Sequence, residues 1–123
     1  MKRCDLTDLT LDQLVDRYAE IGVAQYDVLR NKPISQFRPL FDRQIEVDEE
    51  LRRRGVEARL ALLRLYDHPN IQVRLNVAQE TYRVAPEQAV ALLKQIAQTE
   101  TYPQAADARL SLENIANGTS LLK

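Results

Sequence analysis

Residues 60–78 read LALLRLYDHPNIQVRLNVA, and this stretch decides the fold of the chain. Its apolar residues recur at intervals of three and four, which is the period of a helix with a buried face. Asp67-His68-Pro69-Asn70 interrupts the pattern as a short turn, and Asn70 is placed to cap the helix that follows. We therefore expect one helix over Val56 to Tyr66, a tight turn, and a second helix that runs to about Val84.

The helix after the turn is expected to lie between neighbours. One of its faces carries Leu75, Ala78, Tyr82 and Ala85, and another carries Val73, Val77, Thr81 and Val84. A helix with apolar side chains on two faces has to be covered on both sides. The pattern therefore predicts helices packed before and after it.

Two further helices are predicted on the C-terminal side. Pro86 suits the first position of a helix, since proline lacks the N–H that would be unpaired there. The last helix is expected to start near Pro103 and to stop at Gly118, with residues 118–123 forming a flexible tail. The apolar face of the helix after Pro86 consists of Ala89, Leu92, Leu93, Ile96 and Ala97.

Residues 10–54 are predicted to form an antiparallel helical hairpin. Thr10 and Gln13 have the spacing of a capping box, so the first helix should begin there and run to about Arg30. Its predicted apolar stripe consists of Leu11, Leu14, Val15, Tyr18, Gly22, Tyr26 and Leu29. The second helix should start near Ser35, with Pro39 in its first turn, and end at Gly55. The residues expected to face the core are Phe37, Leu40, Phe41, Val47 and Leu51.

Composition and length bound the fold class. A chain of 123 residues with 45% hydrophobic residues can bury a core of its own, so residues 1–123 are expected to form one domain. No alternating run of β-branched residues occurs, and the predicted class is all-α with about six helices. No apolar run approaches the ~20 residues that span a bilayer, and the sequence shows no secretory signal. Cys4 is the single cysteine, so it cannot form an internal disulfide. A cytoplasmic protein without membrane contact is therefore expected.

The second half of the chain repeats weakly on itself. Val73 to Val77 align with Ala108 to Leu112 at an offset of 35 residues, which divides residues 56–117 into two helix pairs. Such units bury their faces by stacking, and Val77 and Leu112 should lie at equivalent depth. Arg74 and Arg109 occupy matching positions and are predicted to form a polar ladder between the units.

These motifs resemble known families. The turn at Asp67 to Asn70, followed by Val73-Arg74, resembles a HEAT-type repeat, although His68 stands where those repeats more often have aspartate. Together with Leu51-Arg52-Arg53-Arg54-Gly55, the turn resembles small bacterial proteins of the domain-of-unknown-function family numbered twenty-nineteen. That resemblance covers roughly residues 10–117 and implies an α-α superhelix of HEAT/ARM-like hairpins. It implies no activity and no catalytic residues.

One basic cluster is the candidate partner-binding site. Residues 52–83 hold 7 basic and 3 acidic side chains, whereas residues 1–51 hold 7 and 11. The cluster consists of Arg52, Arg53, Arg54, Arg59 and Arg64. Guanidinium groups in such a cluster could bind carboxylates or a phosphate. The structural alternative is a set of helix-surface ion pairs at i, i+4, which would join Asp48, Glu49 and Glu50 to the arginines four residues on.

The sequence contains no catalytic, metal or cofactor signature. Glycine-rich phosphate loops are excluded because the three glycines are isolated, and no Glu-x-x-His motif occurs. A hydrolase or metal site would have to use Glu46, Glu49 and Glu50 with His68. The His68 ring is expected instead to bond the backbone of its own turn. We therefore predict no catalytic residue, no metal and no cofactor.

The function predicted from these observations is a non-enzymatic protein-protein interaction module. Stacked helix pairs offer a rigid surface to another protein, and an immunity or antitoxin-like protein that occludes its partner would be one example. The open end of so short a stack could also support weak self-association. The alternative is nucleic-acid binding by the basic stretch Arg52 to Arg83, which the overall charge of −1 disfavours.

Overall fold

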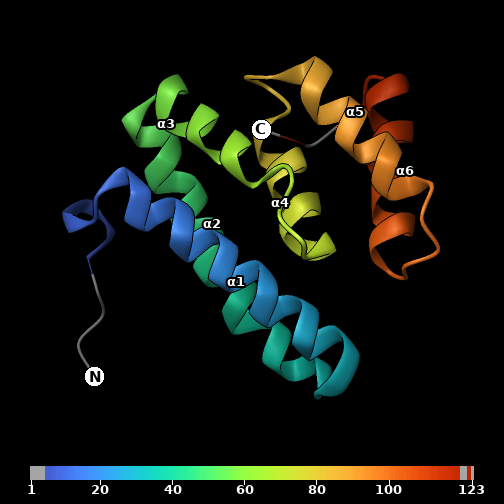
Figure 1. Ribbon diagram of the computed structural model, residues 1–123, viewed down its shortest axis with the longest axis horizontal. Helices are drawn as coiled ribbons and strands as arrows, with labels where there is room; N and C mark the ends of the chain where they lie inside the picture. Colours follow the sequence, from blue (N-terminus) through green and yellow to red (C-terminus); the bar gives the residue numbers. More distant parts are fainter. Residues whose placement is uncertain (1–4, 120–121, 123) are drawn as a thin grey trace.

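The computed structural model of the protein describes residues 5–119 and 122, and this part of the chain is helical without a strand (Figure 1). Its elements in chain order are η1 (Leu6–Asp8), α1 (Leu11–Asn31), η2 (Ile34–Gln36), α2 (Phe37–Arg54), α3 (Val56–Leu60), η3 (Ala61–Leu65), α4 (Ile71–Thr81), α5 (Pro86–Ala97) and α6 (Gln104–Ala116), where η marks a 3-10 helix. The predicted all-α class with six α-helices is confirmed. None of the helices in these residues is both long and apolar enough to cross a membrane.

The N-terminal hairpin begins and ends where the sequence predicts. The Thr10 hydroxyl accepts from the Gln13 backbone N–H at 3.1 Å, and the Gln13 side chain accepts from the Thr10 N–H at 2.8 Å, which completes the capping box. Pro39 lies in the first turn of α2. Gly55 ends that helix with φ at 110°, a conformation that side chains with a Cβ rarely adopt.

The helix expected over residues 56–66 is divided. After α3 the backbone tightens into η3, and the Tyr66 N–H and the His68 N–H close the turn by donating to the carbonyl oxygens three residues before them. The Asn70 side chain then accepts from the N–H groups of Gln72 and Val73, so it is the predicted N-cap of α4.

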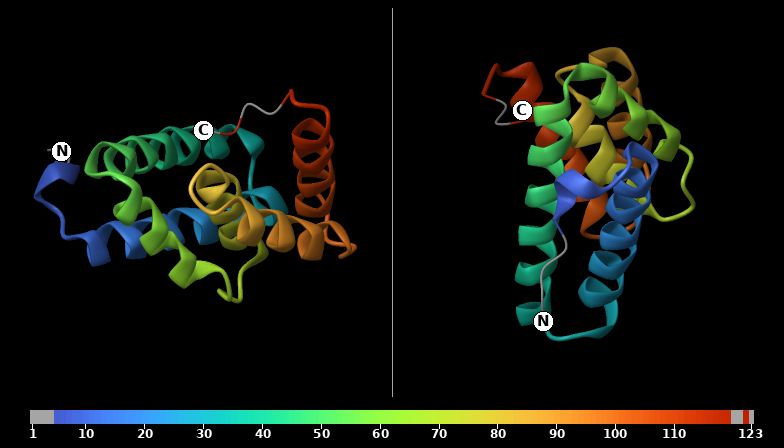
Figure 2. Two further views of the ribbon diagram at one scale, coloured as in Figure 1. Left: turned by 90° about the horizontal axis from the view of Figure 1, so that it is seen from above. Right: turned by 90° about the vertical axis from the view of Figure 1, so that its left-hand side faces the viewer.

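Helix α4 lies at the centre of the molecule. It packs against α1 on one side and α5 on the other, and α6 returns along α5 to reach α4 as well (Figures 1 and 2). The predicted placement of this helix between neighbours is therefore confirmed. α1 and α4 approach closely because Gly22 has no side chain: a Cβ built at Gly22 would stand 2.7 Å from Cγ2 of Val73 and 3.1 Å from its Cα.

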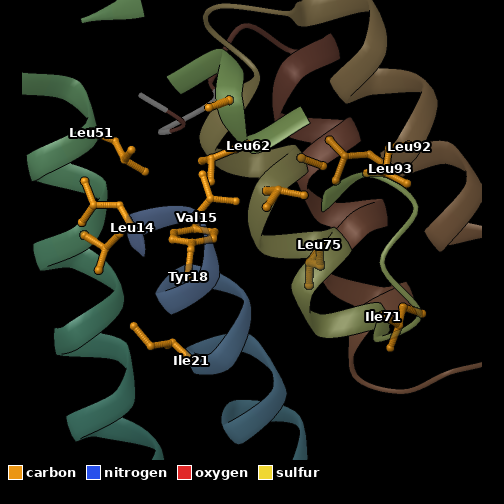
Figure 3. Packing of buried hydrophobic residues seen from close by; sticks show 14 of the residues in the cluster. Leu14, Val15, Tyr18, Ile21, Leu51, Leu62, Ile71, Leu75, Leu92 and Leu93 are labelled. Atoms are coloured by element: carbon orange, nitrogen blue, oxygen red, sulfur yellow. The ribbon is translucent and has the colours of Figure 1, made fainter. Parts of the chain in front are cut away.

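A continuous band of buried apolar side chains runs from the hairpin through α4 to α5 (Figure 3). Leu14, Val15 and Tyr18 belong to it, as their spacing predicts. In the second half of α1, however, the buried residues are Ile21, Gly22, Gln25 and Val28, whereas Tyr26 and Leu29 are only partly buried. The predicted stripe is therefore wrong at its C-terminal end, because α2 and α4 cover a slightly different side of α1 there.

Three residues expected in the core of α2 are not buried. Phe41 is 41% exposed, and Phe37 and Leu40 are partly exposed, whereas Val47 and Leu51 are buried as predicted. Val77 is fully buried, but its repeat counterpart Leu112 is only partly buried at the edge of the core. The two repeat positions therefore do not lie at the same depth.

The C-terminal end agrees with the predicted stop. Gly118 has φ at 70°, and the Thr119 N–H donates to the Asn114 carbonyl oxygen at 2.8 Å, which closes the end of α6. Arg83 donates from Nε to the carbonyl oxygen of Leu122 at 2.9 Å. The other residues of the predicted tail, and Cys4, lie outside the described part of the chain.

We predict that Gly22→Ala destabilises the protein even though alanine is the better helix former. The added methyl must displace Val73, and such overpacking costs about 1–3 kcal/mol, which exceeds the roughly 1 kcal/mol gained in helix propensity. The free energy of unfolding in denaturant should fall. In a Val73→Ala background the same change should become neutral or favourable, and a stabilised Gly22→Ala single variant would contradict the close crossing of α1 and α4.

Candidate binding surface

Arg52 and Arg59 are bonded to a carboxylate of α4. The Arg52 guanidinium donates to both carboxylate oxygens of Glu80, from Nε at 3.1 Å and from Nη2. Arg59 lies beside the same carboxylate, with Nε 3.4 Å from Oε2, and its Nη2 donates to the Glu80 carbonyl oxygen at 2.8 Å. Because Glu80 is buried, it needs these cations as compensation. The bonds fasten α2 and α3 onto α4.

Arg53 and Arg54 share a second carboxylate, that of Glu50. Both guanidinium groups bond to it, and these bonds lower the pKa of Glu50 to about 2. The Nη2 atom of Arg54 also donates to the carbonyl oxygens of Leu6, at 3.1 Å, and Leu9, at 2.7 Å. Arg54 therefore ties η1 and the start of α1 to the end of α2.

The candidate arginine site is thus divided among internal bonds. Arg64, the fifth member, pairs with Asp12 of α1 on the surface. Of the three ion pairs expected along α2, only Glu50 with Arg54 is formed: Arg52 reaches Glu80, and Arg53 bonds to Glu50. The structure does not bring the five arginines together as one open surface.

Asp48 is buried one helical turn before Arg52. Its Oδ1 atom has no hydrogen-bond partner among the residues that the structure describes. Burial, together with the nearby negative charge of Glu80, raises the pKa of Asp48 to about 8, while the Arg52 charge acts in the opposite direction. Asp48 and Glu80 therefore form an acidic pair inside the protein, which sequence reasoning did not find because the two residues are 32 positions apart.

A chain of side-chain amides crosses the interior from α6 to α2. Each amide donates to the next, over distances of 2.7 to 2.9 Å, in the order Gln104, Gln72, Asn76, Gln25 and Gln44. We call these five residues the amide chain. The Gln44 amide in turn donates to the Tyr18 hydroxyl at 3.3 Å. Four helices are joined by this chain, and no member of it was identified from the sequence.

The predicted arginine ladder between the helix pairs is absent from the described residues. Arg109 is exposed, and Nε of Arg74 is buried without a hydrogen-bond partner. The junction of α4 and α6 is bonded instead by Gln72 with Gln104 and by Gln79 with Ser111. Amides suit this junction because they satisfy one another without the cost of a buried charge.

The residues considered for a metal or hydrolase site lie apart. Glu46 and Glu49 line an open depression beside η1, whereas His68 lies at the edge of a groove along the outer face of α1. Nδ1 of His68 accepts from the Asn70 backbone N–H at 3.0 Å, as predicted for a turn histidine. Within residues 5–119, no three acidic, histidine or cysteine side chains are placed to hold a metal ion.

The surface most suited to binding is the far end of the hairpin, which extends beyond the rest of the molecule (Figure 2). Ile34 is 69% exposed, Phe41 41% and Ile45 37%. Phe37 stacks on Phe41 with the ring centroids 6.4 Å apart. We call Ile34, Phe37, Phe41 and Ile45 the tip stripe.

The tip stripe continues the side of α2 that carries Arg52, the residue that bonds to Glu80 of α4. Phe41, Ile45, Asp48 and Arg52 follow one another at four, three and four residues, so they share one side of the helix. Near Arg52 that side is covered by Glu80 of α4. Phe41 and Ile45 lie nearer the N-terminal end of α2, where no described element covers them and the apolar side remains open to solvent.

Comparisons with known proteins agree with this architecture. The sequence model of a family described as a domain of unknown function (DUF2019) matches residues 12–116. The crystal structure of the protein RPA1889 from Rhodopseudomonas palustris CGA009 is similar, with a TM-score of 0.92 and 39% identity over 98% of this chain and 100% of that one. No curated protein matches the chain significantly.

We predict that Arg54 is needed for stability whereas Arg43 is not. Arg54→Ala removes charge-assisted bonds to Glu50, Leu6 and Leu9, and its free energy of unfolding should fall by on the order of 2 kcal/mol. Arg43→Ala changes an exposed residue of the same helix and should cost less than about 0.5 kcal/mol. Denaturant unfolding of both variants checks this, and equal losses would contradict the structural role of Arg54.

We predict that Asp48→Asn stabilises the protein at alkaline pH. With a folded pKa of about 8 against 3.8 in the unfolded chain, Asp48 takes up a proton on folding between these pH values, so its contribution to stability falls as the pH rises from about 4 to about 8. Asparagine stays neutral, and above pH 8 the variant should be more stable by on the order of 2 kcal/mol. Thermal unfolding at pH 5 and pH 9 measures the difference.

The control for this prediction is Glu49→Gln, which changes an exposed carboxylate next to Asp48 in sequence. It should keep the slope of stability against pH seen in the wild-type protein. A wild-type slope in Asp48→Asn would show that Asp48 ionises in the folded protein as freely as in the unfolded chain.

Proposed function

The chain belongs to the DUF2019 family, and from its surface we propose that it is a non-enzymatic protein-interaction module that binds its partner through the tip stripe. The observation that carries the proposal is the exposure of Ile34, Phe41 and Ile45 on an element that extends from the body. Clustered apolar side chains left in water are unfavourable, and they commonly mark a site of contact with another protein.

The rest of the fold supports such a role. The two helix pairs after the hairpin form, in this proposal, a short HEAT-like stack that holds α1 and α2 in place. Arg52, Arg54 and Arg59 fasten that stack to the hairpin. A rigid binding element loses little conformational entropy when its partner arrives. An immunity or antitoxin-like protein, which occludes a partner, would use a surface of this kind.

Nucleic-acid binding by Arg52 to Arg83 is less well supported. Arg52, Arg53, Arg54, Arg59 and Arg64 already bond to carboxylates of the same chain, which neutralises the charge that phosphates would need. Arg83 donates to the Leu122 carbonyl oxygen and lies over the Tyr82 ring. This alternative requires a salt-dependent complex with duplex DNA that weakens in Arg53→Ala.

We predict that replacing the exposed apolar side chains abolishes partner binding. Tagged wild-type protein and the double variant Phe41→Ser/Ile45→Ser are purified under native conditions from the source cells, and the retained proteins are compared. A protein retained in stoichiometric amount by the wild type should be lost from the variant. Leu110→Ser, which changes a residue that is 55% exposed on α6, should retain it.

Circular dichroism verifies that each variant keeps its helices. Should the double variant unfold, Ile34→Ser provides the same test, since Ile34 lies outside α2 and is the most exposed member of the tip stripe. A wild-type protein that retains nothing, or a partner that stays bound to both tip variants, would contradict the proposed function.

A further inference from the structure

The charge around the tip stripe differs in sign from that of the rest of the protein. Residues 30–45 contain four basic side chains, Arg30, Lys32, Arg38 and Arg43, and a single acidic one, Asp42. The whole chain has a net charge of −1, so the remaining residues are acidic on balance. The apolar stripe is therefore set in a local excess of positive charge.

The cations at the tip can exchange their present partners for the carboxylates of a binding protein. Lys32 pairs with Asp27 at 3.5 Å, and Arg38 pairs with Asp42 at 3.1 Å, but both pairs are on the surface, where such contacts contribute little. Arg43 makes no ion pair or hydrogen bond with the residues that the structure describes. This contrasts with Arg52 and Arg59, which a buried carboxylate holds in place.

The spacing of the side chains in the tip stripe suits the docking of a second helix. Phe37, Phe41 and Ile45 stand at successive turns of α2 and extend over about 12 Å of its axis. The ridge that they form matches the groove between side chains of a second helix laid against it. At the other end of α2 the same side carries Arg52, which bonds to Glu80 of α4, so a partner helix would lie on a side that already faces a helix of the protein.

We propose that the tip stripe binds an amphipathic helix of a partner protein whose apolar face is flanked by glutamate and aspartate. The inference rests on the proposed function and adds the chemistry of the partner. The apolar face of the partner covers Phe41 and Ile45, while its carboxylates meet the excess positive charge of the tip, with Arg38 the nearest exposed cation of α2. Complementary charge of this kind selects among partners and speeds their association.

The test uses two fluorescent helical peptides with the same leucine face, one flanked by glutamate and the other by lysine. Fluorescence anisotropy should show that the full-length protein binds the glutamate peptide about tenfold or more tightly than the lysine peptide. The preference should shrink as salt is added, because exposed charges are screened.

Charge-reversed variants identify the residues that select the peptide. Lys32→Glu/Arg38→Glu should lose or invert the preference, while Phe41→Ser/Ile45→Ser should weaken binding of both peptides. The matched control is Lys94→Glu/Arg109→Glu, which makes the same change of charge at exposed positions of α5 and α6 and should behave as the wild type. Circular dichroism establishes that each protein remains helical.

Other outcomes would overturn the inference. Equal affinity for the two peptides, or binding of neither, removes the acidic helix as the partner, even where variant-dependent capture still supports the proposed function. Light scattering that shows a dimer disrupted by Phe41→Ser/Ile45→Ser assigns the stripe to a second copy of the chain. Cosedimentation with phosphatidylserine vesicles that is lost in the same variant assigns it to a membrane surface.

Discussion

The structure depends on one constraint: helix α4 is enclosed by other helices, so its polar side chains must find their hydrogen-bond partners within the protein. α1 and α5 cover its apolar faces, but its third face carries Gln72, Asn76 and Glu80, which are also buried. Each of these groups would be costly to bury without a partner. The amide chain bonds the first two to α1 and α6, and arginines of α2 and α3 bond the third. The polar face of α4 therefore determines how the other helices are arranged around it.

The same constraint separates the rigid part of the hairpin from its free end. Where α2 lies near α4, polar bonds such as that between Arg52 and Glu80 hold it in register. Toward Phe41 the hairpin passes beyond α4, and only α1 covers α2. One neighbouring helix can bury one face, so Val47 and Leu51 lie in the core while Ile45 and Phe41 do not. The exposed apolar stripe thus results from a hairpin that is longer than the stack it supports.

Local signals in the sequence predicted the helix boundaries well. The capping box at Thr10, the N-cap at Asn70, the proline at position 86 and the glycines at positions 55 and 118 all act through neighbours within a few residues, and each is placed as expected. Burial was harder to predict, because it depends on which helix lies opposite. Phe41 follows the apolar period as well as Leu51 does, and only the tertiary arrangement distinguishes them. Gln25 looks like a surface residue until Gln44 and Asn76 are brought to its side chain.

The arginine run illustrates why the candidate site could not be read from charge alone. From the sequence, the acids expected to pair with Arg52 and Arg53 are Asp48 and Glu49, four residues earlier on the same helix. The fold pairs Arg52 with Glu80 instead, whose buried carboxylate accepts from both Nε and Nη2, while the pKa of Asp48, which is buried as well, rises to about 8. Basic residues drawn inward in this way contribute to stability and are lost to recognition. Arg38 is the reverse case: it attracts little notice in the sequence, yet it remains exposed beside an uncovered apolar stripe, which is where charge can select a partner.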